Sequence, residues 1–161
     1  MKKILITLSL MLVVTASALK REVKIKKPNG VLPDITVVKE NGRATWNIYK
    51  SERSDRVSLY GLNIHHANKL LQAANRAQAF YKEIAGSGRC PNSKVKSGSF
   101  GEIQEYKKGD SISFEVVCSK NKIQLEIMMT DEYVIDFLII RTEPAHLKLL
   151  SQRLITELKK K

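Results

Sequence analysis

In the stretch SISFEVVCSKNKIQLEIMMT, residues 111–130, apolar side chains alternate with polar ones on both sides of a short polar turn. A period of two bounded by turn residues is typical of a β-hairpin with one buried face. The turn is expected at Lys120-Asn121-Lys122. The side chains expected on the buried face are Ile112, Phe114, Val116, Cys118, Ile123, Leu125, Ile127 and Met129.

Further elements are expected on both sides of this hairpin. A weaker strand is predicted near Glu102–Lys107, and the segment Tyr133–Arg141 is apolar on both faces, as in a central or covered strand. Thr142 is expected to cap a helix that tolerates Pro144 in its first turn. The apolar stripe of this helix would be Leu147, Leu150, Leu154 and Leu158.

The first half of the chain repeats this plan at an offset of 79 residues, since Glu22–Leu71 aligns without a gap with Gly101–Leu150. Eight aligned positions are identical, and they fall on matching landmarks. Gly30 aligns with Gly109, and Ile48 aligns with Ile127. A match at one fixed offset indicates an internal repeat.

The first copy predicts a strand at Glu22–Lys27, a strand ending at Lys39, an Asn41-Gly42 hairpin turn, and strands at Ala44–Lys50 and Arg56–Tyr60. A helix would follow, capped by Asn63 and ending near Ala85 before Gly86. Its inward side chains would be Ala67, Leu70, Leu71, Ala74, Ala77, Tyr81 and Ile84. Residues 86–100, rich in Gly, Ser and Lys, are expected to connect the two copies.

We therefore predict an α+β fold built by tandem ββββα duplication, with one fused antiparallel sheet and two helices on one face. Residues 19–161 would form a single domain of two repeats, 22–85 and 101–161. One repeat alone offers too small a core to be stable.

The composition is that of a basic globular protein. The 161 residues include 28 Lys and Arg against 16 Asp and Glu, and 43% of them are hydrophobic, which excludes a disordered or low-complexity chain. The positive excess lies before residue 101, because 101–161 contains ten basic and ten acidic residues.

The start of the chain is typical of a secretory signal peptide. Lys2 and Lys3 precede an apolar run from Ile4 to Val14, and small residues end at Ala18, where cleavage is expected. The alternative is a membrane anchor, but the run is about half of the ~20 residues that a spanning helix needs. We expect a periplasmic or secreted protein without a transmembrane segment after cleavage.

Export affects the expected oxidation state of the two cysteines. An oxidising compartment favours a structural disulfide between Cys90 and Cys118. A metal site would need further ligands nearby, and His65-His66 and His146 stand apart from them. The sequence therefore predicts no metal site and no cofactor.

The face of the first repeat opposite the helices is predicted to be basic and polar. The candidate polyanion-binding residues on it are Lys24, Lys26, Asn47, Tyr49, Arg56 and Tyr60. Cations neutralise phosphates, and exposed rings stack on the bases of single-stranded nucleic acid. The alternative is an ordinary solvated sheet face.

The corresponding face of the second repeat is expected to mix acidic and apolar side chains, which does not suit a polyanion. Its apolar members Met128, Ile135 and Phe137 predict a dimer or partner contact.

Tandem ββββα repeats resemble the Whirly and purine-rich-element-binding (PUR) family of single-stranded nucleic-acid-binding proteins. The stretch Val38–Ile48 resembles the second and third strands of a PUR repeat, with a Lys-Glu-Asn turn followed by a basic residue and an aromatic one. In topology the resemblance covers most of the mature chain. At the level of individual residues it covers this one hairpin. It implies nucleic-acid binding by the sheet.

Three classes of function follow. The first is an exported, basic, non-enzymatic binding module for a polyanion such as single-stranded nucleic acid. The second is a protein-interaction module (an inhibitor, an immunity partner or an envelope assembly factor) or a homodimer, acting through the second repeat. The third is an enzyme, for which the sequence supplies no catalytic constellation. We expect the first.

Overall fold

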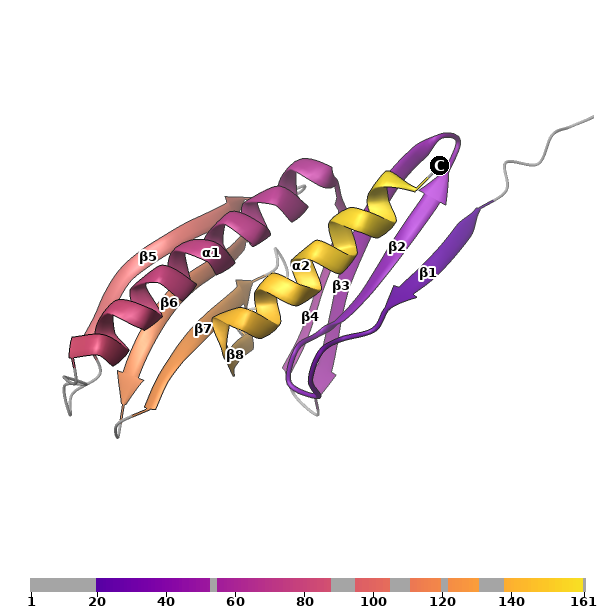
Figure 1. The fold of residues 1–161 in the computed structure, drawn as a ribbon. Helices are drawn as coiled ribbons and strands as arrows, with labels where there is room; N and C mark the ends of the chain where they lie inside the picture. Colours follow the sequence, from indigo (N-terminus) through magenta and orange to yellow (C-terminus); the bar gives the residue numbers. More distant parts are fainter. Residues whose placement is uncertain are drawn as a thin grey trace, which may run out of the picture.

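The computed structural model describes residues 20–52, 55–87, 95–104, 111–119, 122–130 and 138–160 (Figure 1). The first sheet consists of β1 (Arg21–Ile25), β2 (Asp34–Glu40), β3 (Arg43–Glu52) and β4 (Asp55–Leu62), and α1 (Ile64–Ser87) follows it. The second sheet consists of β5 (Val95–Gln104), β6 (Ser111–Ser119), β7 (Lys122–Thr130) and β8 (Leu138–Thr142), and α2 (Pro144–Lys159) follows it. The fold is therefore α+β, and all of its paired strands are antiparallel.

The prediction of one fused sheet is wrong. Each half forms its own sheet in sequential order, β1-β2-β3-β4 and β5-β6-β7-β8. The two sheets adjoin where β4 contacts β8, but these strands share no ladder of hydrogen bonds. Alternation along a strand reports which of its faces is buried and says nothing about which strand from the other half lies beside it.

The helices are exchanged between the halves. Helix α1 contacts β5, β6 and β7, whereas α2 contacts β1, β2 and β3. The two helices also contact each other, and both lie on the same side of the sheets (Figure 1). Each half therefore supplies the helix that covers the other half's sheet.

Polar contacts fasten α2 to the first sheet. Arg153 Nη1 donates to the carbonyl of Lys26 at 2.8 Å. Lys39 Nζ lies 3.5 Å from Glu157 Oε1 and donates to the carbonyl of Lys160 at 3.0 Å. These contacts join residues more than 100 positions apart in the sequence.

The core lies between the helices and the sheets. Trp46 and Phe114 are fully buried, one in each half, and the predicted leucine stripe of α2 is buried as expected. Trp46 Nε1 donates to the carbonyl of Asn63 at 2.8 Å, which ties β3 to the start of α1. In the predicted inward face of α1, Leu71, Tyr81 and Ile84 are only half-buried.

Local signals are confirmed at two places in the first half. Asn41 and Gly42 have φ angles of 51° and 73°, as the β2–β3 hairpin turn requires. Asn63 caps α1, because its Oδ1 accepts the backbone N–H groups of His65 at 2.9 Å and His66 at 3.3 Å.

The predicted cap at Thr142 is wrong. Glu143 precedes α2 and its side chain makes no capping hydrogen bond. The Thr142 hydroxyl instead accepts from Asn29 Nδ2 at 3.1 Å, and the same amide lies 2.9 Å from His146 Nδ1. A contact with the loop after β1 has replaced the local cap.

Some boundaries also differ from expectation. Helix α1 continues to Ser87, and β5 begins at Val95, so the segment predicted as a connector (86–100) contains parts of both. Strand β8 is Leu138–Thr142, and the earlier part of the predicted strand lies outside the described residues. Neither described helix has a stretch that is long and apolar enough to cross a membrane.

Candidate functional site

The outer face of the first sheet, opposite α2, is organised in rows across its strands. Lys24 on β1 pairs with Thr36 on β2, which pairs with Asn47 on β3. Asp34 pairs in the same way with Tyr49, and Tyr49 with Ser58. Their neighbours Ile35, Ile48 and Leu59 are buried, so these rows face away from the helix.

Two tyrosines stand on this outer face. The side chains of Tyr49 and Tyr60 are 45% and 55% exposed. Because Tyr49 pairs with Ser58, Tyr60 is its diagonal neighbour on β4, at a Cα separation of about 7–8 Å for such positions. The name tyrosine platform is used below for Lys24, Lys26, Thr36, Asn47, Tyr49 and Tyr60.

A β-bulge positions Tyr60. The register of β3 and β4 shifts between Trp46 and Ile48, and Gly61 opposite the shift has φ 70°. The backbone N–H of Gly61 donates to Asn47 Oδ1 at 2.9 Å. Asn47, predicted as a binding residue, thus uses its side-chain carbonyl oxygen to hold the bulge. A glycine inside a strand pattern is the signal that could have revealed this bulge.

The lysines of the platform are solvent-exposed. Lys24 and Lys26 have no carboxylate partner among the residues that the structure describes. Acidic neighbours exist, but lysines outside the platform pair with them. Glu22 lies 3.0 Å from Lys20 Nζ, and Asp34 lies 3.3 Å from Lys27 Nζ. The hydrogen bond with Glu22 raises the pKa of Lys20.

Three of the remaining predicted residues fall where side chains are not described. Arg56 and Cys118 lie on β4 and β6, but their side chains lie outside the described part of the structure. Cys90 lies outside it altogether, so the disulfide remains a prediction.

The outer face of the second sheet differs in chemistry. Met128 pairs with Ile139, and the two side chains are 38% and 40% exposed. Ile135 and Phe137, predicted to join Met128 in a partner contact, lie outside the described residues. Alternation places Ile139 on the same face as Met128, and the pairing of β7 with β8 makes the two direct neighbours.

A charged row lies beside this apolar pair. Glu115 pairs with Glu126, which pairs with Arg141, and Arg141 Nε donates to Glu126 Oε2 at 2.9 Å. Val117, placed on this face by alternation, is only 7% exposed. Among the described side chains of this face, Met128 and Ile139 are therefore far more exposed than Val117.

The histidines make local contacts at the starts of the two helices. His66 Nδ1 accepts the backbone N–H of Asn63 at 3.1 Å, and its ring lies edge-on to His65 with centroids 5.9 Å apart. The amide nitrogen of Asn29 can only donate, so His146 Nδ1 is its acceptor. Within the described ranges, no three His, Cys, Asp or Glu side chains gather as a metal site would require.

Comparison of the chain with protein-family models, with curated proteins and with solved structures returned no match.

Proposed function

We propose that this protein is an exported, basic, non-enzymatic binding module for a polyanion such as single-stranded nucleic acid, which lies on the outer face of the first sheet. The observation that carries the proposal is the pair of exposed, diagonally adjacent rings, Tyr49 and Tyr60, on the face that also carries Lys24 in its row with Thr36 and Asn47.

The chemistry of the platform fits such a ligand. Each base stacked on an aromatic ring contributes about 1–3 kcal/mol, and the two rings are close enough to take neighbouring bases. The lysines at the β1 end would neutralise phosphates and release counterions. The amide of Asn47, between them, can donate to a phosphate or a base edge.

Export and the disulfide belong to the same proposal. They are supported by the signal-peptide pattern of residues 1–18 and by the two cysteines of the chain. Mass spectrometry of the protein recovered after export would test both. The expected mass corresponds to a chain that begins at Leu19 and lacks two thiol hydrogens.

We further propose that the two halves arose by duplication of a ββββα unit. Adding the offset of 79 to the bounds of β2, 34–40, gives 113–119, which falls inside β6, Ser111–Ser119. The same shift carries β3, 43–52, to 122–131, beside β7, Lys122–Thr130. The resemblance to the Whirly and PUR family remains part of this proposal.

The test is a salt titration of the exported protein against labelled single-stranded DNA, duplex DNA and heparin. We expect a preference for the single strand and an affinity that falls steeply with salt. The double variant Tyr49→Ala/Tyr60→Ala should weaken single-strand binding about tenfold or more, while Tyr49→Phe/Tyr60→Phe should retain it, because a phenyl ring still stacks.

A charge-matched pair of variants separates the platform from the general charge. Lys24→Glu/Lys26→Glu should weaken binding strongly, and adding Arg56→Glu should abolish it. Arg76→Glu/Lys82→Glu changes the net charge equally at exposed positions of α1 and should have a much smaller effect. Equal losses in the two variants, or equal weak binding to all three ligands, would show that the attraction is generic.

A second candidate function is a protein contact through the second sheet, favoured by the exposed pair Met128 and Ile139. Self-association or a stoichiometric partner that survives high salt, and that is lost in Met128→Glu/Ile139→Glu, would support it. Retention of that association in the variant would exclude this face.

A further inference from the structure

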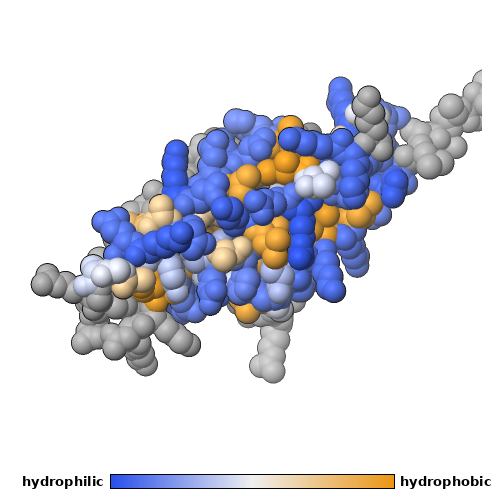
Figure 2. All heavy atoms as spheres, in the orientation of Figure 1, coloured by the Kyte–Doolittle hydropathy of each residue, from blue (hydrophilic) through white to orange (hydrophobic). Residues whose placement is uncertain are grey.

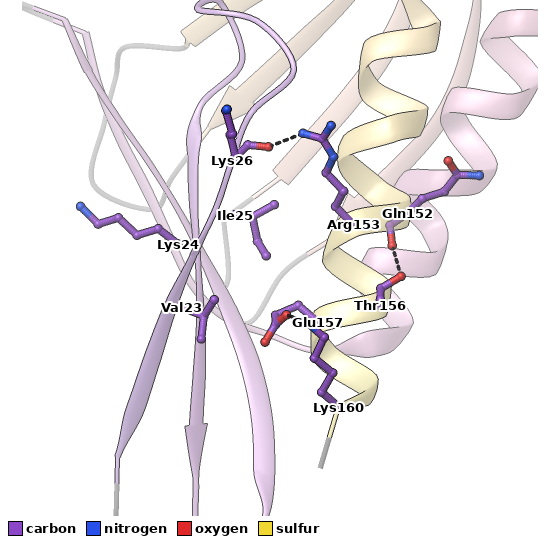
Figure 3. A pocket seen from close by; sticks show the side chains of 9 residues that line it. All are labelled: Val23, Lys24, Ile25, Lys26, Gln152, Arg153, Thr156, Glu157 and Lys160. Carbon is purple, nitrogen blue, oxygen red and sulfur yellow. Dashed lines mark hydrogen bonds and ion pairs between the residues drawn. The ribbon is translucent and has the colours of Figure 1, made fainter.

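A cleft separates β1 from α2. It has a volume of about 370 Å³, and its walls are Val23 to Lys26 on the strand side and residues of the second half of α2 on the other (Figure 3). This volume is at the low end of ligand sites, about 300–1,000 Å³, and suits a few side chains.

Strand β1 is at the end of its sheet. In the described part of the chain it pairs with β2 alone, so its second edge offers backbone N–H and C=O groups beside the cleft. An edge of this kind can accept another extended chain as an added strand.

The side chains of β1 alternate between the cleft and the outer face. Val23 and Ile25 are half-buried and lie on the helix side, whereas Lys24 points away from the helix (Figure 3). Figure 2 shows apolar surface between α2 and β1 with hydrophilic surface around it. A strand added to β1 would therefore place every second side chain against an apolar wall and the others beside exposed lysines.

The charge around the cleft is positive. Lys24, Lys26, Arg153 and Lys160 contribute four cations, against the single carboxylate of Glu157. That carboxylate is already paired with Lys39 and Lys160. The cleft is thus complementary to an acidic chain.

We propose that the cleft between β1 and α2 docks an extended acidic segment of a partner protein, which adds to β1 as a further strand of the first sheet. The segment alternates apolar side chains, which face Val23, Ile25 and Thr156, with acidic ones, which face Lys24 and Lys26. This site is distinct from the tyrosine platform on the other face of the sheet, although the two share these lysines.

The probe is a fluorescently labelled peptide of alternating glutamate and valine with blocked ends, and its affinity for the full exported protein is measured by anisotropy. Two control peptides are informative. One carries N-methyl groups on alternate backbone nitrogens, and the other has lysine in place of glutamate. Loss of several backbone hydrogen bonds should weaken the methylated peptide about tenfold or more, and the lysine peptide should not bind.

Two protein variants test whether the peptide binds in the cleft. One variant fills the cleft and the other leaves it open. Thr156→Trp places a large ring in the cleft and should reduce peptide affinity about tenfold or more. Leu149→Trp introduces the same ring at an exposed α2 position outside the cleft and should change affinity less than about twofold. Thermal unfolding of both variants controls for folding, and hydrogen exchange should show peptide-dependent protection of the amides of β1.

Several results would overturn the proposal: absence of binding to the glutamate-valine peptide, equal binding of its methylated form, or undiminished binding by Thr156→Trp. A wild-type dimer that Thr156→Trp converts to a monomer would show that the cleft holds a second copy of this chain, and would also overturn it. Single-stranded DNA binding should be unchanged in Thr156→Trp, so the failure of either proposal is recognisable without the other.

Discussion

The two sheets have the same strand order, but their outer faces carry different kinds of side chain. On the first, two exposed tyrosines share the face with Lys24, which lies in a row with Thr36 and Asn47. On the second, a Glu126–Arg141 ion pair lies beside the apolar Met128 and Ile139. The faces toward the helices are alike, because both bury aliphatic and aromatic side chains. Packing thus constrains one side of each sheet, while the solvent side is left for function.

Because the helices are exchanged, the two halves should depend on each other for stability. Separating the halves should therefore have the largest effect. A chain ending at Ser87 would retain β1–β4 and α1 but lack α2, which covers its sheet. We expect residues 20–87 alone to lack a cooperative thermal transition, and addition of residues 88–161 to restore one, both measured by circular dichroism. A cooperative transition in the isolated first half would show that each half is a complete unit.

The two fully buried aromatic residues test whether the halves unfold together. Trp46→Ala and Phe114→Ala should each lower the free energy of unfolding by about 3–5 kcal/mol. Denaturant unfolding should remain a single transition in both, because each half holds the other's helix. Tyr60→Ala, at a position that is 55% exposed, is the control and should change stability by less than about 0.5 kcal/mol. Two separated transitions in either core variant would contradict the shared core.

The first residues of the two helices also differ, and the expected effect on stability is smaller. Asn63→Ala removes the acceptor for two backbone N–H groups of α1 and should cost about 1 kcal/mol. Glu143→Ala at the start of α2 removes no capping hydrogen bond and should cost much less. Equal losses in thermal unfolding would mean that the capping contact of Asn63 contributes nothing.

The smallest effect is expected at the carboxylate that α2 presents to the first sheet. A hydrogen bond from Lys160 holds the pKa of Glu157 below its ordinary value of 4.5. A carboxyl whose pKa is depressed by folding stabilises the protein above its unfolded pKa, and this contribution is lost as the pH falls through the folded pKa. Glu157→Gln should therefore reduce stability modestly at neutral pH and have little effect at strongly acidic pH. A loss of the same size at every pH would assign the effect to packing.

Local features of the fold could be predicted from the sequence. The Asn41-Gly42 turn, the cap at Asn63 and the buried stripe of α2 each depend on a few neighbouring residues, and all three were identified. Features that join distant residues could not be predicted. Periodicity showed which side of α2 is buried, but it could not show that this side packs on β1–β3 instead of on its own sheet. The Thr142 error has the same origin, because Asn29 lies 113 residues away.

The candidate site shows the same difference between local features, which could be predicted, and features that join distant residues, which could not. Alternation along each strand placed Tyr49 and Tyr60 on the exposed face, where the structure has them. The bulge held by Asn47 and Gly61 and the pairing of Met128 with Ile139 depend on register between strands. Register is a relation between two strands, so neither strand alone contains it.

The hydrogen bond from Arg153 to Lys26 spans 127 residues, so the first sheet gains its cover only after most of the chain has been made. Closing so large a loop before its contacts can stabilise it slows folding. Until then, β1–β4 would expose an apolar face during synthesis. We therefore expect refolding from denaturant to be slow for a domain of this size, with a late step in which both helices dock together.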